Sequence, residues 1–145
     1  MEINSSVTVV RRSDEVFDYL ADMSNNPEWQ KGMKSCRWTS DGPIGVGSTY
    51  DQVATMMGRE IRSSFEVTEF EPGRLIRIVT TESSFPIGVT RTVDPVGDEA
   101  RVSAIVRGDS SGFFKLAEPV MRRMVKRSVD GDYARLKSLL ESNEV

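Results

Sequence analysis

The last third of the sequence carries one long helical pattern, which limits the choice of fold more than any other feature. It predicts a single helix of roughly thirty residues, because apolar residues recur every three or four positions. From Phe114 these are Ala117, Met121, Val125, Val129, Tyr133, Leu136 and Leu140, and Phe113, Leu116, Val120 and Met124 widen the apolar face in the first half. Such a helix is expected to lie across a curved sheet, with flexible methionines over whatever the sheet encloses. The pattern therefore favours a container for an apolar ligand.

Length and composition indicate one domain, residues 1–145. The net charge of −3 argues against general nucleic-acid binding, which needs a basic surface. The single cysteine, Cys36, cannot form an internal disulfide, the first residues lack a secretion signal, and no apolar run is long enough for a membrane span. We therefore expect a cytoplasmic protein without stable membrane insertion.

The chain contains no histidine, which removes the commonest general base near neutral pH and the commonest transition-metal ligand. With only one cysteine as well, Ser-His-Asp and Cys-His nucleophiles and ordinary zinc sites are excluded within the chain. We predict no metal site and no cofactor. Any catalysis would have to use carboxylates, Tyr, Lys, Arg or ordered water.

Strand-like segments and short turns precede the helix. Polar and apolar residues alternate in a first predicted strand at 3–10, short helical segments follow at 13–20 and 25–29, and further strands are predicted at 33–39, 48–57, 60–70, 74–81, 85–93 and 100–107. The short connections suit an antiparallel meander. The order predicts an α+β fold whose long final helix is kinked at Pro119 or divided there from a short lead-in turn.

Five segments carry a resemblance to a known family: VFDYLAD at 16–22, PEW at 27–29, GPIGVGSTY at 42–50, VTEFEPGRL at 67–75 and LKSLLE at 136–141. In this order and spacing the chain resembles the START-like (SRPBCC) superfamily, and in particular its polyketide cyclase/dehydrase subgroup. One departure is Ala100, where the family often has Thr. The resemblance implies the helix-grip fold of the birch pollen allergen: a seven-stranded antiparallel sheet wrapped around the C-terminal helix, two short helices after strand 1, and a cavity between sheet and helix. It implies little about function, because the family includes lipid carriers, hormone receptors and cyclases.

Side-chain alternation assigns an inner face to the predicted sheet. The inward residues are Cys36 and Trp38; Ile61, Ser63, Phe65 and Val67; Ile76, Ile78, Thr80 and Glu82; and Val102, Ala104 and Val106. The family register adds Tyr50, Gln52 and Ala54.

Arg91 is the most unusual residue of this face, because strand parity places it inside, between Val89 and Val93. A buried guanidinium needs an anionic partner or several acceptors. Arg91 could hold a ligand carboxylate, phosphate or enolate. Its hydrogen-bonding companions would then be the polar inward residues Tyr50, Gln52, Ser63 and Thr80. Alternatively, it forms an internal ion pair with Glu82 or Asp51, or a shifted strand leaves it in solvent.

Several other side chains have two interpretations each. Trp29 and Trp38 could stack on a flat ligand or fill the core, and the resemblance places Trp29 near the cavity mouth. Met121 and Met124 fit a pocket wall or the core, Phe85 fits a rim, and Cys36 fits a buried apolar position. The basic residues of the long helix could meet anionic lipid or an acidic partner, or form a solvated face paired with Glu118 and Asp130. They are Arg122, Arg123, Lys126 and Arg127.

Three functional hypotheses follow. The leading one is binding of a small or medium hydrophobic molecule, polyketide-, aromatic- or lipid-like, in an internal cavity between the sheet and the C-terminal helix. The predicted ligand-binding residues are Trp29, Trp38, Tyr50, Gln52, Ser63, Phe65, Ile78, Thr80, Val89, Arg91, Ala104, Phe114, Met121, Met124 and Val125. The second is a polyketide cyclase/dehydratase-type enzyme in which Arg91 and Tyr50, the candidate catalytic residues, stabilise an enolate. The third is an interaction module with a filled core, whose basic helix face contacts partner helices or a second copy in a homodimer.

Overall fold

The computed structural model describes residues 1–56, 58–108 and 113–142, and within them all side chains except those of residues 113–118. In chain order the elements are β1 (Glu2–Val9), α1 (Ser13–Ala21), the 3-10 helix η1 (Met23–Asn25), α2 (Asn26–Trp29), β2 (Met33–Trp38), β3 (Thr49–Met56), β4 (Arg59–Glu71), β5 (Leu75–Glu82), β6 (Ile87–Val96), β7 (Glu99–Gly108) and α3 (Phe113–Glu141). This confirms the predicted α+β order of strand, short helices, six strands and long helix.

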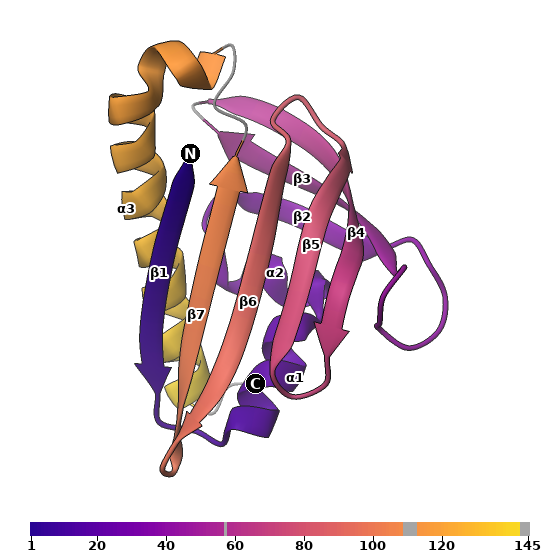
Figure 1. The fold of residues 1–145 in the computed structure, drawn as a ribbon, viewed down its shortest axis with the longest axis vertical. Coiled ribbons are helices and arrows are strands. Elements are labelled where there is room, and N and C mark those ends of the chain that lie inside the picture. Colours follow the sequence, from indigo (N-terminus) through magenta and orange to yellow (C-terminus); the bar gives the residue numbers. More distant parts are fainter. Residues whose placement is uncertain (57, 109–112, 143–145) are drawn as a thin grey trace.

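The strands form one seven-stranded sheet in the order β1-β7-β6-β5-β4-β3-β2, and all neighbours are antiparallel. The sheet curls so that β2 and β3 lie behind the front strands in Figure 1, with α3 along the β1 edge and α1 at the lower end. The tight turns β4–β5 and β6–β7 contain Gly73 and Gly97, with φ of 79° and 62°. This left-handed region favours glycine and suits hairpin turns.

The predicted end of β6 at residue 93 is wrong, because the strand continues through Pro95 to Val96. The register of β5 and β6 stops at Leu75 opposite Thr92, so the last part of β6 pairs with β7 only. The N–H of Val93 faces the β5 side, where it donates to the carbonyl of Arg74. The nitrogen of Pro95, two residues on, faces the same side, where the ladder has already ended. A proline therefore removes no ladder hydrogen bond here.

Helix α3 is continuous from Phe113 to Glu141 and contains Pro119. Its first turns lie at an angle to the rest in Figure 1, as expected where a proline removes a helical hydrogen bond and crowds the preceding turn. No helix among the described residues is both long and apolar enough to cross a membrane.

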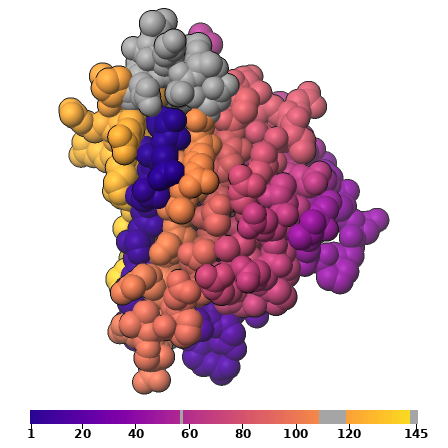
Figure 2. Space-filling view, viewed as in Figure 1, coloured from indigo at the N-terminus to yellow at the C-terminus, as the bar shows by residue number. Residues whose placement is uncertain are grey.

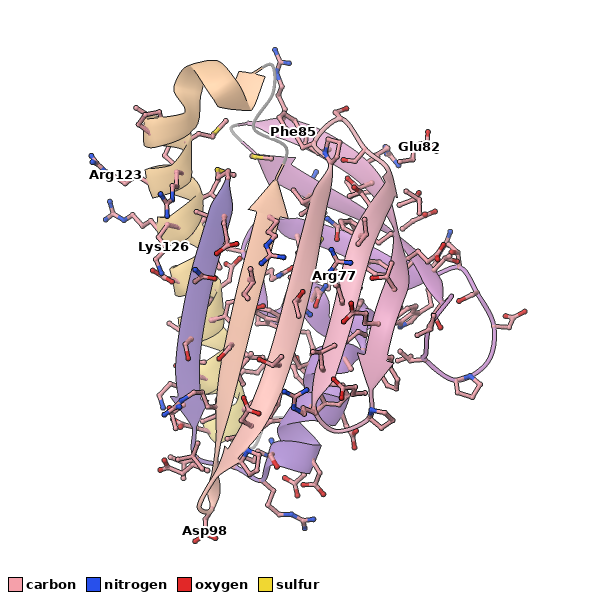
Figure 3. The ribbon with its side chains drawn as sticks, in the orientation of Figure 1. Arg77, Glu82, Phe85, Asp98, Arg123 and Lys126 are labelled. Carbon is pink, nitrogen blue, oxygen red and sulfur yellow. The ribbon has the colours of Figure 1, made fainter. Side chains whose placement is uncertain are left out.

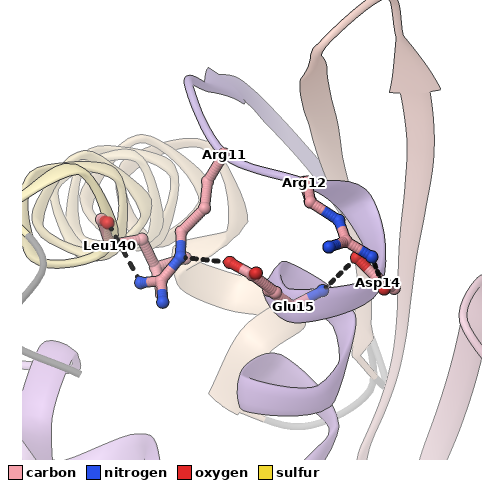
Figure 4. Close-up of polar contacts among 5 residues, drawn as sticks. All are labelled: Arg11, Arg12, Asp14, Glu15 and Leu140. Atoms are coloured by element: carbon pink, nitrogen blue, oxygen red, sulfur yellow. Dashed lines mark hydrogen bonds and ion pairs between the residues drawn. The ribbon is translucent and has the colours of Figure 1, made fainter.

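Hydrogen bonds fix α3 to β1 and to the start of α1. Ser5 Oγ donates to Asp130 Oδ1 at 2.7 Å, and the N–H of Val10 donates to Glu141 Oε2 at 2.8 Å. Figure 4 shows Arg11 donating from Nη1 to the carbonyl of Leu140 at 3.2 Å and from Nε to Glu15 Oε2 at 2.8 Å. The C-terminal end of α3 is thereby anchored to the segment that leads from β1 into α1.

The predicted inner face of the sheet is confirmed for most strands by burial. Its fully buried residues include Tyr50, Phe65, Val67, Ile76, Val93, Val102 and Ala104. The opposite face is the one seen in Figure 2, where β1, β7, β6 and β5 lie next to one another. Glu82, predicted inward, is exposed at the end of β5.

Candidate functional site

The interior is packed at one end and hollow at the other. Val67, Ile76 and Val93, on β4, β5 and β6, are at most 1% exposed and belong to the apolar core. The next inward residues, two positions away on the same strands, are Phe65 on β4, Ile78 on β5 and Arg91 on β6. All three line a cavity. The boundary between packed core and hollow therefore crosses the sheet at these positions.

The cavity has a volume of about 210 Å³ and lies between the sheet and the middle of α3, from Val125 to Tyr133. Most of its lining is apolar, and the polar side chains are few. The lining residues are Met1, Asn26, Gln30, Met33, Tyr50, Gln52, Ala54, Met56, Ile61, Ser63, Phe65, Ile78, Ser83, Phe85, Ile87, Val89, Arg91, Val106, Val125, Val129, Asp132 and Tyr133. In Figure 3, Phe85 lies near the N-terminal end of α3, and Asp98 marks the opposite end of the molecule. The hollow thus occupies the Phe85 end.

Arg91 lies at the inner end of this cavity and is only 2% exposed. Its Nε donates to Tyr133 Oη at 3.1 Å. Its Nη1 donates to the carbonyl of Leu20 and to Asn26 Oδ1, both at 3.1 Å, and contacts Met23 Sδ at 3.3 Å. The residue is thus inside, as predicted, but its bonding partners come from α1, η1, α2 and α3 rather than from the sheet.

The ion pair with Glu82 or Asp51, one of the alternatives for Arg91, is wrong, because among the described residues no carboxylate forms an ion pair with it. Its own hydrogen bonds go to none of the four polar residues expected beside it around a ligand, and their role towards a ligand stays a prediction. Asp51 accepts a hydrogen bond from Ser64 Oγ instead, and Glu82 is exposed. The physical reason is the bend of the chain after α1, which brings backbone and amide acceptors over the sheet.

Trp29 supports the guanidinium from one side. The Cζ atom of Arg91 lies 4.9 Å from the centroid of the Trp29 ring, within the range of a cation–π contact. The Trp29 ring also packs against Tyr133, with ring centroids 4.9 Å apart. Pro27 in the first turn of the short helix α2 sets the path of the chain that places this indole. Trp29 is therefore part of the structure that holds Arg91.

Tyr50 contributes a hydroxyl without a partner to the cavity lining. Its side chain is fully buried, its ring stacks on Phe65 with centroids 5.1 Å apart, and its Oη has no hydrogen bond. Burial raises the pKa of Tyr50 well above its usual value, and the positive charge of Arg91 partly opposes this shift. The hydroxyl is therefore a protonated donor at neutral pH. Trp29 Nε1 and Gln30 Oε1 are also buried without partners.

Asp132 is the acidic residue of the lining. It accepts a hydrogen bond from the N–H of Lys31 at 3.2 Å and is paired with Arg135. Burial raises the pKa of Asp132, while the Lys31 N–H, Arg135 and the positive charge of Arg91 act in the opposite direction. The direct contacts of its carboxylate are with Lys31 and Arg135, and Arg91 acts on it from beyond ion-pair distance.

The family model described as "Polyketide cyclase / dehydrase and lipid transport" matches residues 1–141 of the chain. The protein belongs to this family. No curated protein matches the sequence significantly. The resemblance noted from the sequence is confirmed.

Solved structures confirm the fold of this family member. TTHA0849 from Thermus thermophilus is similar with a TM-score of 0.84 and 17% identity over 100% of both chains. A START superfamily protein from Mycobacterium smegmatis has a TM-score of 0.81 and 13% identity over 97% of both chains. The Zhui aromatase/cyclase from a Streptomyces species has a TM-score of 0.77 and 13% identity over 97% of this chain and 93% of its own.

Within this polyketide cyclase/dehydrase fold, the predicted site residues fall into two groups. Those that line the cavity are Tyr50, Gln52, Ser63, Phe65, Ile78, Val89, Arg91 and Val125. Those with described side chains that do not line it are Trp29, Trp38, Thr80, Ala104, Met121 and Met124. Phe114 lies outside the described side chains.

The residues of the second group have other surroundings. Trp38 donates from Nε1 to Asp22 Oδ1 at 2.8 Å, and Thr80 Oγ1 accepts from the N–H of Ile87 at 3.1 Å. Ala104 and Met121 are buried away from the hollow. Met124 is 49% exposed, because the apolar face of α3 is wider than the surface that the sheet covers.

Other lining residues were not predicted as part of the site. Ala54, Ile61 and Val106 had been assigned inward, and Val129 and Tyr133 continue the helical stripe one and two turns after Val125. For these five residues, the strand alternation and the helical spacing already indicated an inward position. Asn26, Gln30 and Asp132 had no such signal, because their position depends on how distant elements meet.

The basic residues of α3 lie away from the cavity. Arg123 projects from α3 away from the sheet in Figure 3. Lys126 forms an ion pair with Asp130 at 3.0 Å and donates to the carbonyl of Asn4 at 2.5 Å. The predicted pairing with Asp130 is confirmed, whereas the side chain of Glu118 lies outside the described ones.

Proposed function

We propose that this protein binds a small hydrophobic compound in the cavity between the sheet and α3. The observation that carries the proposal is the hollow itself: a space of about 210 Å³ with a largely apolar lining, next to the buried apolar core. An enclosed apolar surface gains free energy when a matching ligand fills it. The family, with its lipid-transport and cyclase members, supports the same function.

The volume limits the size of the compound. A cavity of about 150 Å³ holds one benzene molecule, and sites for drug-sized ligands measure roughly 300–1,000 Å³. The hollow of 210 Å³ lies between these values. We therefore propose an aromatic compound of one or two rings, or a short-chain lipid- or polyketide-like compound. A space of this size also argues against the interaction module with a filled core.

A cyclase or dehydratase activity is the second candidate. The observation in its favour is that Arg91 and Tyr50 contribute donors to one apolar cavity, as stabilisation of an enolate requires. Tyr50→Phe would then lower turnover of a poly-β-ketone substrate without disturbing the fold. Unchanged turnover would remove Tyr50 from the mechanism.

The proposed binding function is tested by native mass spectrometry of the protein purified from its own host. We expect a mass shift from a retained compound, which is lost in Val89→Phe because the larger side chain fills the cavity. Thr90→Phe is the matched control, since Thr90 is the neighbouring residue on the opposite face of β6. Retention of the compound in the folded Val89→Phe variant would place binding elsewhere.

A further inference from the structure

The hydrogen bonds of Arg91 leave one side of its guanidinium open. Arginine has five N–H donors, distributed over Nε, Nη1 and Nη2. Nε and Nη1 are used by Tyr133, Leu20 and Asn26, with Met23 as an additional contact of Nη1. Among the described residues, Nη2 donates no hydrogen bond. Because Arg91 lines the cavity, Nη2 is available to donate hydrogen bonds to a molecule bound there.

The positive charge of Arg91 also lacks an ion-pair partner among the described residues. The acidic residue of the cavity, Asp132, is in direct contact with Arg135 and Lys31, and Arg91 acts on it only from beyond ion-pair distance. A charge that is 2% exposed and unpaired is costly, and the face of Trp29 compensates only part of this cost. The site is therefore electrostatically incomplete.

Tyr50 provides an independent second observation. Its hydroxyl is buried, has no hydrogen-bond partner and belongs to the same cavity lining as Arg91. A buried hydroxyl without a partner destabilises the protein unless an acceptor reaches it. One unpaired cation and one unpaired donor thus line a single apolar space.

We propose that the compound bound in the cavity carries one carboxylate, which accepts hydrogen bonds from Arg91 Nη2 and Tyr50 Oη. A carboxylate has two acceptor oxygens and a single negative charge, which matches one guanidinium and one hydroxyl. A phosphate would bring roughly two negative charges into a space that already contains Asp132. The apolar body of the molecule would contact Ile78, Val89 and Val125. This inference rests on the proposed binding function.

The test compares acids with uncharged amides of the same shape: 2-naphthoate with 2-naphthamide, and octanoate with octanamide. Calorimetric titration at neutral pH is expected to give at least tenfold tighter binding of each acid to the wild-type protein. Arg91→Met should abolish this preference, and Tyr50→Phe should weaken binding of the acids severalfold with little effect on the amides. Arg77→Met is the matched control, because Arg77 lies on the outer face of β5 (Figure 3).

The outcomes separate the inference from the function on which it rests. Equal affinity of acids and amides for the wild-type protein would overturn the carboxylate proposal and leave the apolar site intact. Absence of binding by all four compounds would overturn both. If Arg91→Met does not fold, the acid-to-amide ratio of the wild type and the effect of Tyr50→Phe still decide the question.

Discussion

The guanidinium of Arg91 lies over the ring of Trp29, with 4.9 Å between its Cζ atom and the ring centroid. The contact joins the inner face of β6 to the short helix α2, at the point where the packed core ends. It offsets part of the cost of burying, at 2% exposure, a guanidinium that has no carboxylate partner among the described residues. The indole N–H takes no part, since it has no hydrogen bond.

The loss of stability on replacement of Trp29 should therefore be smaller when the new side chain is also aromatic. We expect Trp29→Phe to lower the free energy of unfolding by about 1 kcal/mol and Trp29→Leu by about 3 kcal/mol, measured by urea denaturation. In an Arg91→Met background the difference between the two variants should shrink by about 1 kcal/mol. An unchanged difference in that background would show that the ring supports the core but not the guanidinium.

The two buried tyrosines of the cavity should respond oppositely to loss of their hydroxyls. Tyr133 bonds to Arg91, so Tyr133→Phe should lower the free energy of unfolding by about 1.5 kcal/mol. Tyr50 has no partner, so Tyr50→Phe should raise the free energy of unfolding of the ligand-free protein by about 1 kcal/mol. Denaturation of both variants under the same conditions checks this. A loss of stability in Tyr50→Phe would mean that its hydroxyl is bonded in solution.

The single thiol should be almost unreactive in the folded protein. Burial raises the pKa of Cys36 to about 12, with the charge of Arg91 acting in the opposite direction. Because the thiolate is the reactive form, modification by a disulfide reagent near pH 8 should be about 1,000-fold slower in the folded protein than in denaturant. Rapid reaction of one thiol per folded chain would contradict the inward position of Cys36.

Asp132 should make the folded protein less stable as the pH rises, which is the opposite of what a carboxylate with a lowered pKa does. Burial raises its pKa, so the folded protein holds the proton more tightly than the unfolded chain does. The charged carboxylate therefore lowers stability above the folded pKa, and this penalty disappears as the pH falls through it. Relative to wild type, Asp132→Asn should gain stability as the pH rises from about 4, the pKa of aspartate in an unfolded chain, through the raised folded pKa.

Asp130 on the same helix is the control for this prediction. Its burial is outweighed by hydrogen bonds from Ser5 and Lys126, which lower its pKa. Stability from this group is present above the unfolded pKa and is lost as the pH falls through the folded pKa. Asp130→Asn should therefore lose stability relative to wild type as the pH rises through the lowered folded pKa to about 4, the pKa of aspartate in an unfolded chain. Parallel pH profiles of the two variants would show that neither shift is present.

Local periodicity predicted the order of elements and the inner face of the sheet. The inward positions of Phe65, Ile78 and Arg91 follow from the two-residue repeat of a strand, which does not depend on the rest of the fold. The extension of β6 through Pro95 could not be predicted in the same way, because a proline is tolerated only where the neighbouring strand has already ended.

The details of the site depended on contacts between distant segments. Leu20, Asn26 and Tyr133 contact Arg91 from α1, α2 and α3, which are all far from Arg91 in the sequence. No local pattern indicates these contacts, so the sequence could not predict the hydrogen-bond partners of Arg91. Likewise, the apolar pattern of α3 could not show that the sheet leaves Met124 uncovered.

The most direct test of a ligand site between sheet and helix is an isotope-filtered NOE measurement on labelled protein with 2-naphthoate. The naphthyl protons should show NOEs to the methyl groups of both Ile78 on β5 and Val125 on α3, because only a molecule inside the cavity can reach both walls. NOEs confined to exposed methyl groups such as those of Val46 and Val120 would contradict the account.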